Sequence, residues 1–119
     1  MPHIVIEGKI NFELIYNNFV KTVERSNNYI IKFDDSFLNH SKDLILIKTM
    51  VIENNTHQNY YIQLMKKENQ TTVRLDPVTD PINKTNSVKI SISKIAKMIF
   101  LIHKESNLSI TKTNLEGYI

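Results

Sequence analysis

The chain has 119 residues, of which 41% are hydrophobic and 23% are charged, and it contains no cysteine. This composition is typical of one globular domain and unlike that of a disordered chain. The absence of cysteine excludes disulfide bonds, thiolate metal sites and cysteine nucleophiles. The net charge is only +3, and just two of the 15 basic residues are arginine, Arg25 and Arg74, which argues against a nucleic-acid partner.

No stretch of the chain reaches the roughly 18 apolar residues that a bilayer span requires. The segment richest in apolar residues, 95–102, is interrupted by Lys97 and followed by His103 and Lys104. No basic segment followed by an apolar run opens the sequence, so the pattern of a secretory signal is absent. We therefore expect a cytoplasmic protein with no membrane partner.

The first part of the chain predicts a strand, a helix and a second strand. Residues 3–7 are mostly β-branched and predict a short strand. Asn11 is a suitable helix N-cap, and apolar side chains recur at helical spacing from Phe12 to Val23. This stripe predicts one amphipathic helix, followed by a strand over residues 29–33.

Three further strands and a loop are predicted in the middle of the chain. Residues 43–53 are apolar at both odd and even positions, as in a central strand with two buried faces. Residues 60–65 and 71–75 predict the two strands of a hairpin. Residues 76–86 contain two prolines and predict a loop.

The pattern over residues 87–105 fits two structures. Val88, Ile90 and Ile92 alternate as in a strand, whereas apolar residues at every third or fourth position fit one face of a helix. The length of the segment and the lysines on its opposite side favour the helix. A last strand is predicted over residues 108–112.

From the order of these elements we predict a single α/β domain, or α+β in stricter usage, over residues 1–119. Two helices would cover one face of a mixed sheet of four to six strands, arranged as two β-α-β-type halves. Because residues 43–53 are apolar on both sides, the other face should be buried by symmetric copies of the chain.

Pro2 is the most informative residue for chemistry. A small second residue such as proline normally permits removal of the initiator Met1, which would leave a secondary amine at the start of the chain. The pKa of a free α-amine is about 7.7 to 8.0, and an apolar or cationic site lowers it further. Such an amine is a usable general base near neutral pH. The alternative reading is that proline is simply common at position 2.

The residues at positions 1–7, Met-Pro-His-Ile-Val-Ile-Glu, resemble the opening of the carboxymethyl-hydroxymuconate isomerase branch of the tautomerase superfamily. The resemblance implies a tautomerase-like β-α-β scaffold and a homotrimer. It also implies that Pro2 moves a proton between carbon and oxygen in keto–enol substrates, and that cationic side chains hold the substrate carboxylates. No metal or cofactor is implied.

Arg74 and Lys48 are our candidates for these cationic side chains. Arginine presents a planar fork that matches a carboxylate, and Arg74 lies next to the proline-containing loop. Lys48 lies within an apolar strand, where an isolated charge is costly. In the alternative readings, Arg74 forms a surface ion pair with Asp76 or Asp80, and Lys48 extends into solvent from a partly exposed sheet face.

Two main hypotheses for the function follow. The first is a cofactor-free tautomerase or isomerase in which Pro2 is the general base and Arg74 and Lys48 bind a small 2-oxo or 2-hydroxy-dienoic acid. The second is a non-catalytic, oligomeric binding or interaction module. The four histidines have no metal-ligand spacing. The lysines within residues 87–105 fit the solvent side of a helix better than a nucleic-acid site.

Overall fold

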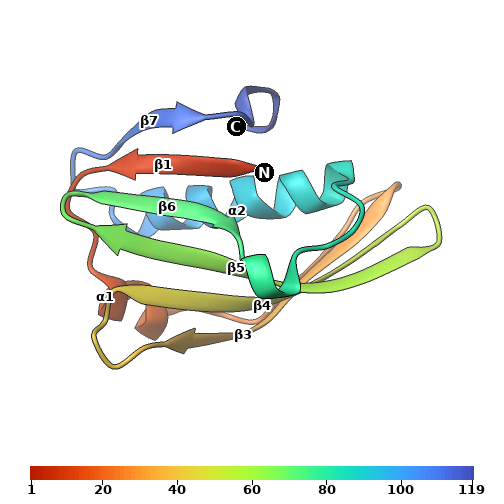
Figure 1. Cartoon of the computed structure of the whole chain (residues 1–119), viewed down its shortest axis with the longest axis horizontal. Coiled ribbons are helices and arrows are strands. Elements are labelled where there is room, and N and C mark those ends of the chain that lie inside the picture. Colours follow the sequence, from red (N-terminus) through yellow and green to blue (C-terminus); the bar gives the residue numbers. More distant parts are fainter.

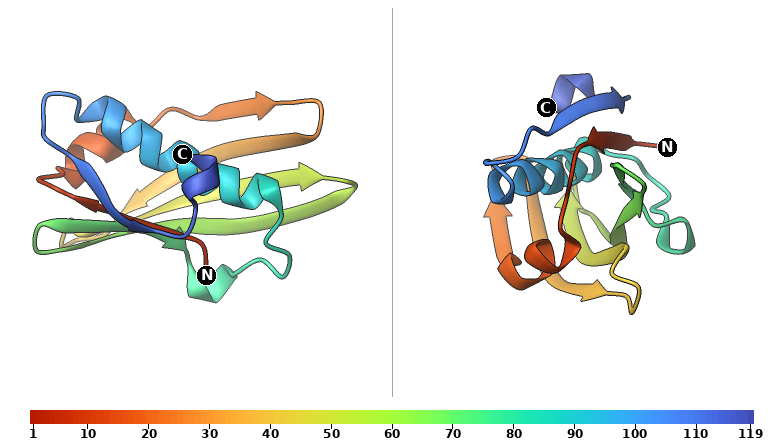
Figure 2. Two further views of the ribbon diagram at one scale, coloured as in Figure 1. Left: turned by 90° about the horizontal axis from the view of Figure 1, so that it is seen from above. Right: turned by 90° about the vertical axis from the view of Figure 1, so that its left-hand side faces the viewer.

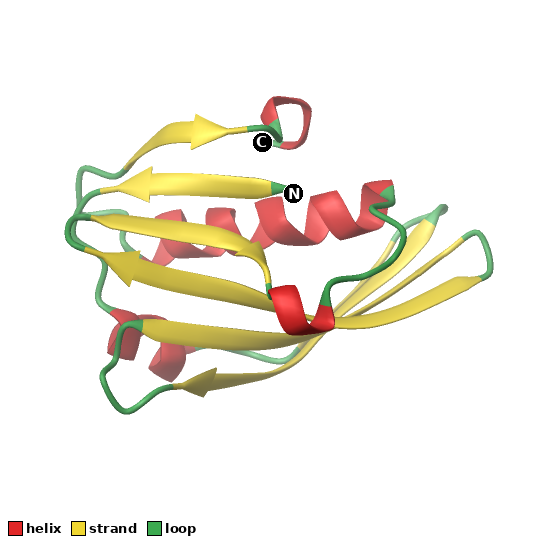
Figure 3. Cartoon of the chain, viewed as in Figure 1, coloured by secondary structure: helices red, strands yellow, loops and turns green.

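The computed structural model describes all 119 residues, and most of them belong to one large sheet and two helices (Figures 1 and 3). The elements in chain order are β1 (His3–Glu7), α1 (Phe12–Asn18), β2 (Thr22–Arg25), β3 (Tyr29–Leu38), β4 (Leu44–Glu53), β5 (Thr56–Lys67), β6 (Gln70–Leu75), α2 (Asn86–Ile102) and β7 (Ser109–Thr113). Short 3-10 helices lie at Pro77–Thr79 and Glu116–Tyr118.

The sheet has seven strands in the order β2-β3-β4-β5-β6-β1-β7, and every neighbouring pair is antiparallel. The predicted tautomerase-like fold is therefore wrong: the sheet is not mixed, it has more than six strands, and it is not built from two β-α-β-type halves. The reason lies in the connections. The segment containing α1 carries the chain from β1, near one edge, to β2 at the other edge, whereas a β-α-β unit returns it to a parallel strand.

The predicted helix over residues 12–23 is also too long. α1 ends at Asn18, and the next residue, Phe19, already has extended backbone angles. Val20, Thr22 and Val23 are β-branched and favour a strand over further turns of helix. Thr22–Arg25 accordingly pair with β3 as an edge strand.

Several other predicted elements are confirmed. β4 lies in the interior of the sheet between β3 and β5, β5 and β6 form a hairpin, and the segment after residue 86 is a helix. The turn between β4 and β5 consists of Asn54 and Asn55, both with positive φ. Asparagine tolerates this left-handed conformation, which two-residue hairpins with the favoured twist require.

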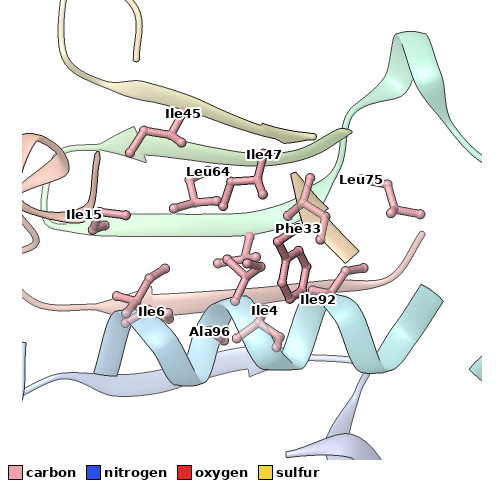
Figure 4. Close-up of a cluster of buried hydrophobic side chains, with 14 of the residues drawn as sticks. Ile4, Ile6, Ile15, Phe33, Ile45, Ile47, Leu64, Leu75, Ile92 and Ala96 are labelled. Carbon is pink, nitrogen blue, oxygen red and sulfur yellow. The ribbon is translucent and has the colours of Figure 1, made fainter. Parts of the chain in front are cut away.

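The sheet curls around α2, and α1 lies on the same side (Figure 2). Apolar side chains of the strands meet those of the helices in this interior, with Ile4, Ile47 and Leu64 facing Ile92 and Ala96 (Figure 4). All five are at most 1% exposed. The hydroxyl groups of Tyr60 and Ser91 are hydrogen-bonded at 2.6 Å, and this buried hydrogen bond links β5 to α2.

The opposite side of the sheet, which we call the uncovered face, faces the viewer in Figure 1. Strand alternation places Leu44, Leu46 and Lys48 of β4 on this face, while Ile45 and Ile47 point to the helices. Leu44 and Leu46 are half-buried, so β4 is apolar on both sides, as the sequence indicates. Burial of this face by symmetric copies, and the homotrimer, stay predictions.

Candidate functional site

Pro2 lies just before β1, and its side chain is buried. It lies on the same side of the sheet as Ile4 and Ile6, which face the helices. The carbonyl oxygen of Met1 accepts hydrogen bonds from Nδ1 of His3 at 2.9 Å and from Nδ2 of Asn114 at 3.0 Å. The peptide bond between Met1 and Pro2 is thus held against β1 and the end of the chain.

Arg74 and Lys48, by contrast, both lie on the uncovered face, so the structure brings these two to one surface and places Pro2 on the other side. Nζ of Lys48 lies 3.8 Å from Oδ2 of Asp34. The ion pair that the sequence suggests for Arg74 is not formed. Asp80 pairs with Lys84 at 2.9 Å, and no carboxylate lies within 4.0 Å of Arg74. Arg74 and Lys48 are therefore not placed to bind a substrate next to Pro2, and proton transfer by Pro2 stays a prediction.

A polar cavity of about 700 Å³ lies at one end of the sheet, between the start of α1 and the end of α2. His103 lines it, and both ring nitrogens are engaged by the backbone. Nε2 accepts from the N–H of Asn11 at 3.0 Å, and Nδ1 lies 3.1 Å from the carbonyl of Ile99, to which it donates. Nζ of Lys66 donates to the carbonyl of Ile10 at 3.0 Å. These hydrogen bonds join α1 to its surroundings, so the positions of His103 and Lys66 have a structural explanation.

The two groups with shifted pKa values have structural explanations. Burial raises the pKa of Tyr60, although its hydrogen bond with Ser91 opposes the shift. Hydrogen bonds from the side chain and backbone of Ser87 lower the pKa of Glu53. Tyr60 lies in the core and Glu53 caps the start of α2, so neither marks a reactive centre. No group of three His, Asp or Glu side chains is arranged to hold a metal ion.

A largely apolar hollow of the surface lies between α2 and the edge strand β2, and we call it the α2 groove. Its volume is about 660 Å³. Its lining residues are Asn18, Phe19, Val20, Thr22, Val23, Glu24, Phe33, Lys94, Ile95, Lys97, Met98 and Leu101. Leu101 is 73% exposed, Val20 69% and Val23 51%. Large apolar side chains thus remain in contact with solvent around a concave surface.

A second hollow, of about 450 Å³, lies on the other side of the same helix, toward β7. It shares Lys97 and Leu101 with the α2 groove and adds Phe100, Ile110 and Ile119. The two edge strands of the curled sheet therefore border α2 from opposite sides, as the end-on view of Figure 2 shows. The outer side of α2 therefore adjoins two apolar hollows, with Lys97 and Leu101 exposed between them.

Cations exceed carboxylates along this surface. Lys94 forms an ion pair with Glu24 across the α2 groove. Lys97 and Lys104 have no carboxylate within 4.0 Å. Because the α2 groove has an apolar floor and the unpaired Lys97, with Lys104 in the adjoining hollow, it is complementary to a surface that combines apolar and acidic side chains.

Sequence reasoning missed this groove because it assigned Val20 and Val23 to the buried stripe of a helix. The signal that could have identified it is the succession of β-branched residues after Phe19, which favours a strand over a helix. Leu101 lies within the apolar segment 95–102, and that pattern does not indicate that its side chain is exposed.

No helix of the chain is both long enough and apolar enough to cross a bilayer. Comparison of the chain with family models, with curated proteins and with solved structures found no match. The fold itself is a seven-stranded antiparallel sheet that curls around one long helix and leaves the outer side of that helix partly exposed.

Proposed function

We propose that the chain is a non-catalytic binding module that holds an acidic, amphipathic helix of a partner protein in the α2 groove. One observation carries the proposal: Leu101, Val20 and Val23 stay exposed around a concave surface that carries the unpaired Lys97, with Lys104 in the adjoining hollow. Exposed apolar surface with a polar rim is typical of interaction sites. Recognition of an amphipathic helix in an apolar groove is a common mode of peptide binding.

The dimensions of the α2 groove suit a short helix. Residues 94–101 of α2 form one wall, and a helix rises 1.5 Å per residue, so this wall is about 10 Å long. Apolar side chains at positions i, i+3 or i+4, and i+7 of a partner helix span about the same length. Acidic residues beside them would reach Lys97 and Lys104.

Charge also favours a foreign partner over a second copy of the chain. A symmetric contact between two α2 surfaces would bring Lys97 and Lys104 of each copy close to those of the other. Like charges at an interface are unfavourable, and Glu24, the one acidic side chain that lines the α2 groove, is already paired with Lys94.

The test uses a synthetic helical peptide with leucines at i, i+3 and i+7 and glutamates on the flanking positions. We expect it to bind the full chain, with NMR shift changes at Val20, Val23 and Leu101. The variant Leu101→Ser should weaken binding about tenfold, equivalent to about 1.4 kcal/mol. Because Leu101 is mostly exposed, this change leaves the fold intact. Val78→Ser is the matched control, since Val78 is 91% exposed in the 3-10 helix Pro77–Thr79 and does not line the α2 groove.

Two results would overturn the proposal. One is equal affinity for a peptide in which lysines replace the glutamates, because binding would then ignore the charge of the groove. The other is an unchanged affinity of Leu101→Ser. Binding of the chain to vesicles containing phosphatidylserine, with no binding of the acidic peptide, would assign the surface to a membrane and reject the partner helix.

A further inference from the structure

A row of five residues crosses the uncovered face at the level of Arg74. The strand registers pair Phe37 of β3 with Leu46 of β4, Leu46 with Gln63 of β5, Gln63 with Arg74 of β6, and Arg74 with His3 of β1. Side chains directly opposite one another on neighbouring strands point to the same face. We call these residues the Arg74 row; with strands about 4.8 Å apart it is about 19 Å long.

Arg74 is fixed in place but lacks a counter-charge. Its Nε donates to Oε1 of Gln63 at 2.7 Å, and this is the only hydrogen bond that its side chain makes. Gln63 is only 8% exposed, so the amide holds the base of the guanidinium firmly. The two terminal nitrogens have no partner in the chain, and they form the fork that binds a carboxylate bidentately.

His3 lies at the end of the row with one ring nitrogen free. Its Nδ1 lies 2.9 Å from the carbonyl of Met1, which only accepts, so this nitrogen carries the proton. Nε2 remains without a partner in the chain. When it is protonated, it can donate to an anion held by Arg74, the opposite residue in the register.

The other half of the row is apolar. Leu46 is half-buried, and Phe37 is 47% exposed. The ring of Phe37 meets that of Tyr61 of β5 edge to face, with centroids 6.3 Å apart. The surface therefore changes from aromatic and aliphatic to cationic within the length of a small molecule.

From this arrangement we propose that the Arg74 row binds a small carboxylic acid with an apolar or aromatic body. The carboxylate would pair with the terminal nitrogens of Arg74, and the body would lie over Leu46 and Phe37. A single arginine beside apolar side chains suits a monoanion with an apolar tail better than a phosphate. The site is on the opposite side of the sheet from the α2 groove and does not depend on the function proposed there.

The test compares two probes of the same shape, 4-phenylbutyrate and its neutral amide, by NMR titration of the full chain. We expect saturable shift changes at Arg74, Leu46 and Phe37 with the carboxylate, and affinity at least about tenfold weaker for the amide. This comparison needs no substitution, so it does not depend on the folding of a variant.

A pair of variants sharpens the result. Arg74→Gln should lose at least about tenfold in affinity for 4-phenylbutyrate. Arg25→Gln, at the only other arginine, in the exposed edge strand β2, should leave the affinity unchanged. Equal affinity of the acid and the amide, absence of saturable shifts with the acid, or equal losses in both variants would each overturn the proposal.

Discussion

The two faces of the sheet are built from similar apolar residues but differ in what accompanies them. On the helix side of β4, Ile45, Ile47 and Val51 are at most 1% exposed and pack on other apolar side chains. On the uncovered face, Leu44 and Leu46 are half-buried beside polar and charged neighbours. The first face supplies stability, whereas the second carries groups whose hydrogen-bonding capacity is not used within the chain. We therefore expect binding sites on the uncovered face of the sheet and on the outer side of α2, and not in the core.

The largest expected contrast comes from one substitution made on each face. Leu64→Ala removes a side chain that is fully buried on the helix side and should lower the free energy of unfolding by about 3 kcal/mol. Leu46→Ala, on the uncovered face of the neighbouring strand, should cost about 1 kcal/mol because its side chain already meets water. Urea denaturation measures both. Equal losses would mean that another copy or partner covers the uncovered face in solution.

A smaller effect is expected from the buried hydrogen bond on the helix side. Tyr60→Phe removes the hydroxyl that is hydrogen-bonded to Ser91, while Oγ of Ser91 keeps its bond to the carbonyl of Val88 at 2.6 Å. Because no buried donor is left without an acceptor, the free energy of unfolding should fall by only about 1 kcal/mol. The control is Tyr61→Phe on the uncovered face, which should be neutral in thermal denaturation. A loss above that of Leu64→Ala would contradict this account.

The smallest effect concerns Glu53, at the helix-facing end of β4. Its carboxylate accepts from the backbone N–H of Ser87 at 2.8 Å in the first turn of α2. Glu53→Gln should therefore lower the free energy of unfolding by about 0.5 kcal/mol at neutral pH. Glu105→Gln, on an exposed residue without such a contact, should have no measurable effect.

The effect of Glu53 should also depend on pH. Hydrogen bonds from Ser87 hold its pKa in the folded chain below the ordinary value of 4.5. The folded state therefore binds fewer protons than the unfolded state near that pH, so stability rises with pH through this window. The contribution should be complete above pH 4.5 and vanish as the pH falls through the lowered pKa. Stability curves of wild type and Glu53→Gln that stay parallel from neutral to acid pH would exclude the carboxylate as its source.

Local patterns predicted elements of the fold, but not how they are joined. Alternation over residues 43–53 and helical spacing after residue 86 are local, and both elements are confirmed. Strand pairing depends on contacts between distant segments, so the sequence could not indicate that β1 lies between β6 and β7. The stripe from Phe12 to Val23 predicted a helix that is too long, because apolar residues three or four apart also occur where a helix is followed by a strand.

The candidate surfaces were predictable only in part. The sequence singled out Arg74 for its chemistry, but Gln63 and His3 become its neighbours only through the register of three strands. Lys48 shares the uncovered face, yet its contact with Asp34 depends on the pairing of β3 with β4. The α2 groove was out of reach because its walls come from two segments about 70 residues apart that meet only when the sheet curls.

The position of β1 has a consequence for the order of events during synthesis. β1 precedes both of its neighbours, β6 and β7, in the chain. During synthesis one edge of β1 therefore stays unpaired until β6 (Gln70–Leu75) has emerged, and the other edge stays unpaired until β7 (Ser109–Thr113) has emerged. Contacts between such distant segments are slow to form because a long loop must close first. Pairing of β1 should thus lag behind that among β3, β4, β5 and β6, which follow one another along the chain.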